Sequence, residues 1–332
     1  MLFFLICAAF ALFPEKVICG ASEGIELCLN VVIPSLLPFM ILSGCVIKSN
    51  FARPLGAVLS KIITPITGIS SGGCVCFLTG LVGGYGAGAR AVLESYRKNI
   101  ISKKEAQRLL PFCNNAGPLF VIGTVGVGFY GSKSIGVMLF LVQIITAVIT
   151  ARIFSGQLED SCNIKDEWVF YKKNKPSTGG LITEAVIESG SAIVTACSFI
   201  ILFSAFLEVI PFGEYGIIKG ITEVTRGVSE MSRSGERMLP MTSAFIAWGG
   251  MSVHLQADAL CAHNFSLKTY YAGKIFSGLC AGAVTRFVCA DINLLAVFSV
   301  CTIAVLLIWG VVKKAIFQEF FRLPLFRRQR HS

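Results

Sequence analysis

The chain is built from long apolar blocks, and short polar, glycine-rich breaks interrupt several of them. The clearest breaks are GGYGAGAR at 83–90, CNNAGP at 113–118 and WGGMSVHLQ at 248–256. Backbone that leaves the helix inside a bilayer loses hydrogen bonds that lipid cannot replace, so it is tolerated only where protein packs around it or water reaches it. Many secondary transporters build substrate sites from helices broken in this way. The pattern therefore favours passage of a small solute.

Composition places the chain among integral membrane proteins. Its 332 residues are 54% hydrophobic and only 14% charged, whereas a soluble domain carries about 25% charged residues. The mean hydropathy is +0.73. The net charge of +10 is typical of cytoplasmic loops rich in Lys and Arg. Nucleic-acid binding is not expected, because it needs a folded basic surface that these loops do not provide.

The chain shows no pattern typical of an enzyme or a metal site. Most of its 13 cysteines lie in apolar segments, where a free cysteine behaves as a small hydrophobic residue. Cys74 and Cys76 have the wrong spacing for a zinc or thioredoxin-type pair. The nucleotide-binding, hydrolase and metalloprotease motifs are absent from the sequence. We therefore expect no enzymatic activity, no cofactor and no metal.

We predict an all-α polytopic membrane protein with about eight or nine spans, since a span needs about 20 mostly apolar residues. The predicted spans lie near 1–13, 30–47, 69–89, 110–129, 134–154, 184–212, 239–256, 268–287 and 291–312. Residues 14–29 mix charged and apolar positions, which is typical of a helix at the membrane interface. The inner loops of this arrangement contain more than twice as many Lys and Arg residues as the outer loops, as the positive-inside rule requires.

The two halves of the chain have similar layouts, and the glycine pairs at 83–84 and 249–250 are half the chain length apart. We predict two pseudo-symmetric halves with broken helices or re-entrant segments, which would place a site at their interface. The predicted divisions are an N-terminal segment and interfacial helix (1–29), a first half (30–155), a cytoplasmic linker (156–182), a second half (183–312) and a basic cytoplasmic tail (313–332).

The orientation of the repeats stays open at this point. Pro34 and Pro38 can break the segment 30–47 into a re-entrant hairpin. If 184–212 did the same, the two halves would be inverted. That arrangement would separate the basic loop 90–108 from the basic tail, so the distribution of charge favours full passes.

The first break combines glycines with a tyrosine and an arginine. Glycines recur every four residues over 80–88, which lets another helix approach closely. Their density also favours local unwinding, which would let Gly84, Tyr85 and Gly86 contact a solute. Arg90 closes the segment, and it either reaches lipid phosphate or attracts an anion.

The second break contains two adjacent amides. Asn114 and Asn115 are costly in hydrocarbon unless they are paired. Pro118 frees a backbone carbonyl one turn earlier, near Asn114, and Gly117 adds flexibility. These residues form either part of a solute site or an interhelical contact that only holds the bundle together.

The third break contains the one histidine that lies within a predicted span, His254. Ser252 and Gln256 are four residues apart and share a helix face, while His254 lies off that face unless Gly250 unwinds the start. An ionisable group inside a membrane is often functional, and a core histidine is the alternative.

These stretches resemble a known family. NVVIPSLLPF at 30–39, GGYGAGA at 83–89, FCNNAGPLF at 112–120 and GGMSVHLQ at 249–256 resemble the YlbJ-type sporulation integral membrane proteins (stage V of sporulation), which belong to the wider nucleoside-recognition or Gate-domain group. The resemblance covers nearly the whole chain. The family usually has Gly-Tyr-Pro where this chain has Tyr85-Gly86.

The resemblance implies a function and a location. Such proteins are implicated in passing dipicolinic acid toward the spore through the outer forespore membrane, which derives from the mother cell, and their fold plan is similar to that of concentrative nucleoside transporters. It implies a multi-pass protein of a bacterial cell membrane. Its partners would be lipid and a small, anionic solute, together with copies of itself or other sporulation membrane proteins. The alternatives are a nucleoside-type transporter and a non-transporting scaffold or gate subunit of a sporulation complex.

Dipicolinate is a flat dianion, so a site for it would need amide donors, helix N-termini and a cation. The donors would come from Asn114, Asn115, Ser252 and Gln256, with ring stacking on Tyr85, Trp248 or His254.

Overall fold

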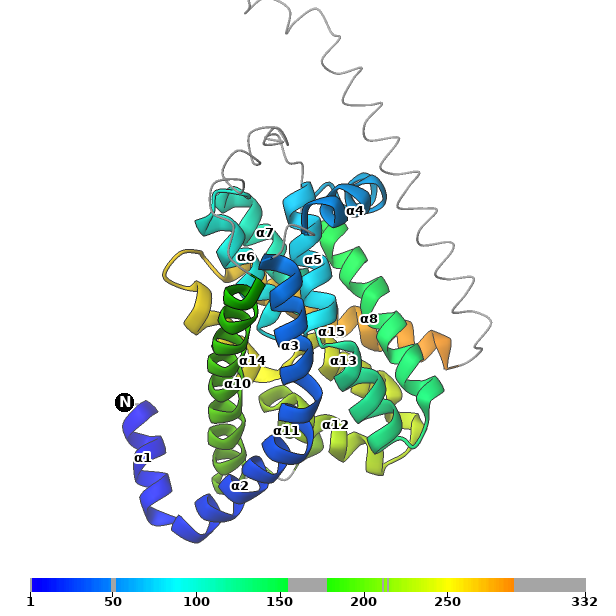
Figure 1. The fold of residues 1–332 in the computed structure, drawn as a ribbon. Helices are drawn as coiled ribbons and strands as arrows, with labels where there is room; N and C mark the ends of the chain where they lie inside the picture. The colour runs from blue at the N-terminus through cyan, green and yellow to red at the C-terminus, as the bar shows by residue number, and fades with distance from the viewer. Residues whose placement is uncertain (1, 49–51, 155–177, 211, 214, 290–332) are drawn as a thin grey trace, which may run out of the picture.

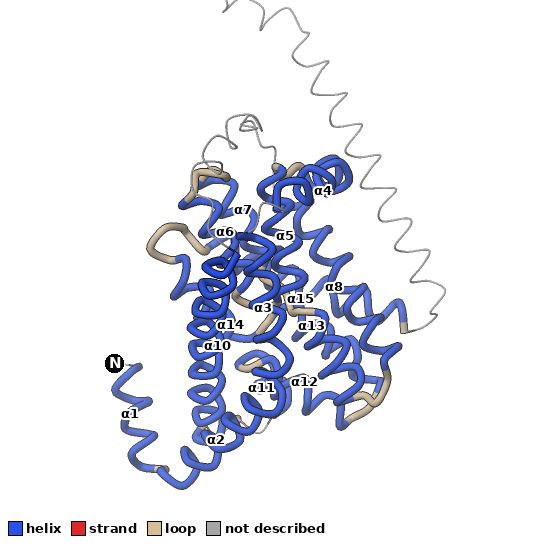
Figure 2. Tube along the Cα trace, viewed as in Figure 1, coloured by secondary structure: helices blue, strands red, loops and turns tan. Residues whose placement is uncertain are grey.

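The computed structural model describes residues 2–48, 52–154, 178–210, 212–213 and 215–289, and every regular element in these ranges is helical (Figures 1 and 2). The elements of the first half are α1 (Leu2–Leu12), α2 (Pro14–Leu27), η1 (Cys28–Val32), α3 (Ile33–Lys48), α4 (Ala52–Thr67), α5 (Ser71–Gly83), α6 (Ala87–Arg97), α7 (Lys103–Cys113), η2 (Leu119–Phe129) and α8 (Lys133–Phe154). Those of the second half are α10 (Thr178–Val209), α11 (Gly216–Thr222), α12 (Val224–Arg233), η3 (Glu236–Met238), α13 (Leu239–Trp248), α14 (Gly250–Cys261) and α15 (Lys268–Val288). The predicted all-α fold is confirmed for the described residues.

Three described helices are long and apolar enough to cross a membrane. They are Pro14–Leu42, α8 and the stretch Gly179–Val209 of α10. A fourth crossing results if α4 and α5, which meet at a bend of 93°, count as one broken span. About eight or nine spans are therefore not confirmed, because breaks divide several of the predicted spans into short helices. The predicted span 291–312, the tail 313–332 and most of the linker 156–182 lie outside the described residues.

The segment predicted as an interfacial helix instead belongs to a candidate span. α2 continues through the π-helical turn η1 into α3, and Pro38 lies inside α3 without ending it. α2 packs on α10 through two glycines, since a Cβ added to Gly20 would lie 2.6 Å from the Ser204 carbonyl oxygen and one on Gly24 would lie 2.8 Å from Ile201 Cα. α3 and α10 are each continuous and run alongside each other (Figure 1). Neither segment forms a re-entrant hairpin.

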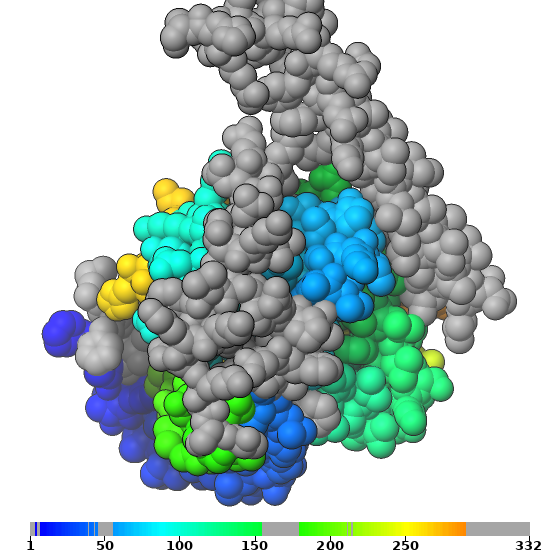
Figure 3. Space-filling model, turned by 45° about the horizontal axis from the view of Figure 1, so that its top comes forward, coloured from blue at the N-terminus to red at the C-terminus, as the bar shows by residue number. Residues whose placement is uncertain are grey.

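The remaining helices pack against one another on one side of α3 and α10 (Figure 1). α5, α6 and α7 pack together and share a buried core with α14 and α15. α4 and α8 lie next to each other on the face shown in Figure 3, in light blue and green. Glu105 of α7 fixes the start of α5, because its Oε1 accepts a hydrogen bond from Ser70 N at 3.0 Å. Burial raises the pKa of the Glu105 carboxyl, and the Ser70 hydrogen bonds oppose that rise.

α5 and α6 both press against the carbonyl end of α7. A Cβ added to Gly80 would lie 1.6 Å from the Cys113 carbonyl oxygen, and one added to Gly88 would lie 1.7 Å from the same atom. Both distances are far shorter than any real contact, so the approach of these helices requires glycine at both positions. The packing role predicted for these glycines is therefore confirmed.

We expect Gly88→Ala to destabilise the protein by about 3 kcal/mol or more, because the obstacle is backbone that cannot rotate away. Thermal unfolding of the purified protein, followed by size-exclusion chromatography, measures the effect. Gly190→Ala is the matched control, since nothing lies within 4 Å of a Cβ at Gly190. Equal stability of the two variants would contradict the packing described for Gly88.

Candidate functional site

The three glycine-rich and amide-rich segments are helix breaks, as the sequence predicted. α5 ends at Gly83 and α6 begins at Ala87, α7 ends at Cys113 before η2, and α13 gives way to α14 after Trp248. Positive φ angles, which favour glycine, occur at Gly84, Gly86, Gly249 and Gly250. Local unwinding at the first and third breaks is therefore confirmed.

The breaks meet one another. A Cβ added to Gly117 would lie 3.3 Å from Gly84 Cα, and one added to Gly249 would lie 3.3 Å from Cε1 of Tyr85. A fourth break, between α11 and α12, joins them, because a Cβ on Gly250 would lie 2.9 Å from Val224 N. This fourth break lies between two of the predicted spans, 184–212 and 239–256, where the sequence analysis predicted no helix.

Asn114 satisfies backbone and side-chain groups around the first two breaks. Its Oδ1 accepts a hydrogen bond from Gly86 N at 2.7 Å, and its Nδ2 donates to the Tyr270 hydroxyl at 3.0 Å. Its own carbonyl oxygen accepts from Lys274 Nζ at 2.8 Å. Pro118 lacks the N–H that would meet this carbonyl in a continuous helix, so the lysine supplies the missing donor.

Other polar side chains cap the remaining breaks. The Tyr85 hydroxyl donates to the Ile246 carbonyl at 2.5 Å, and Gln143 Nε2 donates to the Ala116 carbonyl at 2.8 Å. Asn115 Nδ2 donates to the Phe112 carbonyl at 2.5 Å. These hydrogen bonds correspond to the packing alternative for the two asparagines. Their contact with a solute stays a prediction.

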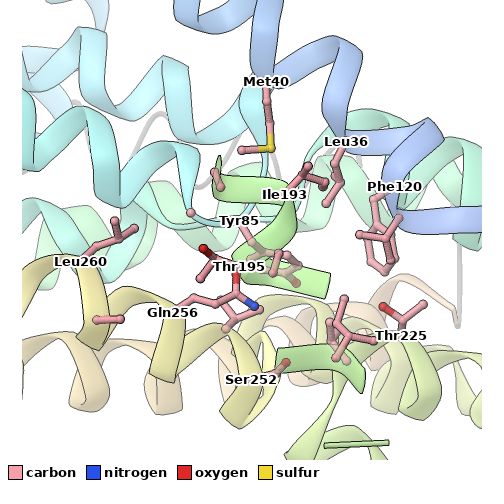
Figure 4. A pocket seen from close by; sticks show the side chains of 18 of the residues that line it. Leu36, Met40, Tyr85, Phe120, Ile193, Thr195, Thr225, Ser252, Gln256 and Leu260 are labelled. Atoms are coloured by element: carbon pink, nitrogen blue, oxygen red, sulfur yellow. The ribbon is translucent and has the colours of Figure 1, made fainter. Parts of the chain in front are cut away.

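A cavity of about 270 Å³ lies beside the breaks (Figure 4). It is lined by η1 and α3, the start of α6, η2, α10, the α11–α12 break and α14. Five of the predicted site residues line it, namely Tyr85, Gly86, Arg90, Ser252 and Gln256. Six are not part of its lining, namely Gly84, Asn114, Asn115, Gly117, Gly250 and His254.

The cavity offers unused hydrogen-bonding groups. The Ser252 hydroxyl is buried and has no partner among the described residues. The Gln256 amide is 8% exposed and forms no hydrogen bond within the described part of the chain. Figure 4 shows the Gln256 and Thr195 side chains directed into the same space. Arg90 uses Nη1 to hold the Glu188 carbonyl of α10 at 2.8 Å, which leaves other guanidinium donors for a ligand.

Glu223 also lines the cavity, and the sequence analysis did not single it out. Its side chain is 1% exposed, and its Oε2 accepts a hydrogen bond from Arg226 N at 2.7 Å, which caps the start of α12. Glu223 lies outside the candidate spans. Burial raises the pKa of its carboxyl, while hydrogen bonds from Arg226 and Thr225 oppose the rise. Glutamate is not among the residues that helix N-caps favour, so the sequence carried no clear signal for this role.

His254 points away from the cavity into a cluster of rings. Its Nδ1 lies 3.0 Å from the Tyr270 hydroxyl, and its ring centroid is 4.1 Å from that of Trp248. Its Nε2 is buried without a hydrogen-bond partner among the described residues. These contacts correspond to the core alternative for this histidine.

The long apolar helices place the chain among integral membrane proteins. No family model and no solved structure match it. It is similar to the sporulation integral membrane protein YlbJ of Bacillus subtilis (strain 168), with 26% identity, and the match covers 83% of this chain and 80% of the relative. This likeness confirms the predicted resemblance to YlbJ-type membrane proteins. The relative's description names no enzymatic activity, in agreement with the predicted non-enzyme.

We expect Tyr85→Phe to lower the free energy of unfolding by about 1–3 kcal/mol, because it leaves the buried Ile246 carbonyl without a donor. Thermal or denaturant unfolding in detergent measures the loss. Tyr215→Phe serves as the control, since Tyr215 is 58% exposed. If both variants were as stable as the wild type, the Tyr85 hydroxyl would not be capping the third break.

Proposed function

We propose that the chain is a membrane transporter of a small organic solute. The observation that carries the proposal is the cavity of about 270 Å³ beside four helix breaks that contact one another, two of which supply residues to its lining. Secondary transporters bind solutes at such breaks between the repeats, and sites for small ligands occupy about 300–1,000 Å³. The two pseudo-symmetric halves and the Gate-domain plan remain part of this proposal.

The cargo that fits the resemblance is dipicolinic acid, moved across the outer forespore membrane during sporulation. A flat aromatic acid matches a cavity walled by the rings of Tyr85 and Phe120, with the Ser252 hydroxyl and the Gln256 amide as hydrogen-bonding groups. Arg90 supplies the positive charge that an anion needs.

Glu223 shapes this charge balance. An ionised carboxylate in the same cavity would repel a dianion. Burial raises the pKa of Glu223, so this carboxyl takes up a proton at a higher pH than an exposed glutamate does. Once protonated, it can donate a hydrogen bond to a carboxylate of the cargo instead of repelling it. Acidic conditions on the side of uptake should therefore assist binding of an anion.

The non-transporting scaffold or gate subunit is the rival function. Its breaks would be packing features only, and its cavity would bind nothing. Purified protein in liposomes separates the two functions. Uptake of radiolabelled dipicolinate or uridine without any partner protein supports the transporter, and absence of uptake and of binding for both solutes contradicts it.

We expect Gln256→Leu to reduce solute uptake by about tenfold, which corresponds to the loss of one hydrogen bond worth about 1.4 kcal/mol. Uptake is normalised to the amount of folded protein in the liposomes. Gln107→Leu is the control, because Gln107 is a partly exposed glutamine on α7 that does not line the cavity. Unchanged uptake in Gln256→Leu would remove this amide from the site.

We expect Arg90→Gln to weaken binding of dipicolinate by at least about tenfold, because a charge-assisted hydrogen bond contributes about 1.5–3 kcal/mol. Binding of uridine, which is neutral, should change little. Isothermal titration of both solutes on one preparation gives the comparison. A loss of stability without a change in dipicolinate affinity would assign Arg90 to holding α10 through the Glu188 carbonyl.

A further inference from the structure

Lys274 is a buried charge that the proposed cargo site does not use. It lies on α15, is 0% exposed, and is not among the residues that line the cavity. No carboxylate in the described part of the chain lies within ion-pair distance of it. Its one hydrogen-bond acceptor there is the carbonyl oxygen of Asn114, at 2.8 Å.

That acceptor is the carbonyl end of a broken helix. α7 ends at Cys113, Asn114 is its C-cap residue, and Pro118 has no N–H to offer the Asn114 carbonyl. The C-terminal end of a helix carries partial negative charge. In secondary transporters, unwound carbonyls and half-helix C-terminal ends coordinate the driving Na⁺ or proton. Lys274 therefore places an ammonium where such carriers bind a coupling cation.

We propose that Lys274 is the coupling-ion site of this transporter, with the proton on its amine taking the place of Na⁺. This inference rests on the proposed function. One proton binds to the Lys274 amine on one side of the membrane and leaves from the same amine on the other side, so each cycle moves one proton and breaks no other covalent bond. The neutral amine keeps a donor for the Asn114 carbonyl, whereas the charged form adds attraction to the helix end.

The hydrogen bonds of Asn114 join this lysine to the cavity. The residue whose carbonyl accepts from Lys274 also accepts, through Oδ1, from Gly86 N. Gly86 lines the cavity next to Tyr85. A change in charge at Lys274 therefore acts on a residue that holds the cavity wall in place. α15 comes close enough for this contact because Gly273 lies against Pro111 of α7.

The surroundings of Lys274 contain few groups that compete for the proton. α13 carries no titratable side chain, and α8 carries Lys133 and Arg152 near its two ends. α7 brings Cys113, next to the accepting residue. α14 brings His254, which interacts electrostatically with Lys274 and shares the Tyr270 hydroxyl with Asn114. Glu223 in the cavity is the rival proton carrier, and the experiment includes it for that reason.

The first experiment measures radiolabelled dipicolinate in liposomes under an imposed gradient of either pH or Na⁺. A gradient of one pH unit supports up to about tenfold accumulation at one proton per solute, and replacing Na⁺ by choline should have no effect. Lys274→Gln keeps a donor for the Asn114 carbonyl but binds no proton. We expect the Lys274→Gln variant to carry dipicolinate down the concentration gradient of dipicolinate but to lose the accumulation that a pH gradient drives.

Lys268→Gln is the matched control, because Lys268 is an exposed lysine on the same helix, and it should accumulate as the wild type does. Accumulation driven by Na⁺ in the wild type overturns the proposal. So does a Lys274→Gln variant that keeps accumulation driven by pH, above all if Glu223→Gln loses it.

The second experiment needs no cargo. Melting temperatures are compared in sodium chloride and in choline chloride at equal ionic strength. In Lys274→Ala, the vacated Asn114 carbonyl should accept Na⁺, which raises the melting temperature by about 2 °C or more, while the wild type shows no difference. An equal response of the wild type, or no response of Lys274→Ala, overturns the cation site. Failure of the wild type to take up dipicolinate refutes the proposed cargo alone, because the sodium response is independent of it.

Discussion

The structure depends on one constraint: a helix broken among apolar helices must find hydrogen-bond partners for the backbone groups that it frees. In this chain the partners are side chains from distant segments. Tyr85 caps the Ile246 carbonyl, Asn114 accepts from Gly86 N, and Lys274 donates to the Asn114 carbonyl. Each hydrogen bond joins two distant parts of the chain, so the residues at the breaks also hold the helices of the bundle together. This explains how glycine-rich breaks persist without exposing backbone to hydrocarbon.

The same constraint separates residues that build the cavity from residues that face it. Asn114 is 0% exposed and uses both side-chain amide atoms within the protein. Ser252 and Gln256 lie on the face of α14 that lines the cavity and keep their polar atoms unpaired in the described part of the chain. A polar side chain near a break therefore either caps backbone groups or faces the cavity, and the hydrogen bonds that it already forms distinguish these two roles. By this criterion Ser252 and Gln256 have the stronger claim to contact a solute.

The sequence predicted the breaks well because glycine, proline and paired amides in apolar blocks have few other structural explanations. The unwinding at Gly84 and Gly249, and the face shared by Ser252 and Gln256, followed from local spacing alone. Glu223 was missed because the polar segment 213–238 reads as a loop from its charge. Lys274 was missed although it lies in the predicted span 268–287, because nothing in that span indicates the helix end that it contacts. In the structure, Glu223 lies beside Gly250 and Lys274 beside Asn114. Long-range contacts of this kind leave no periodic signal in a single sequence.

The walls of the cavity differ in how they are held. One wall is the break cluster, in which hydrogen bonds and bare glycine contacts fix α5, α6, α7, α13 and α14 to one another. The opposite wall is α3 and α10, two continuous helices that meet the cavity mainly through apolar side chains. Polar contacts also hold α10. Arg90 donates to the Glu188 carbonyl, and Arg226 of α12 donates to the Ser204 carbonyl and forms an ion pair with Glu208. Sliding of apolar side chains past one another leaves no buried polar group unpaired, whereas separation of a capped helix end does. Movement at the apolar wall therefore costs less free energy. In the proposed transporter, exposure of the cavity to the two sides of a membrane would require movement of α3 and α10 against the break cluster, and that movement would have to break the contacts of Arg90 and Arg226 with α10.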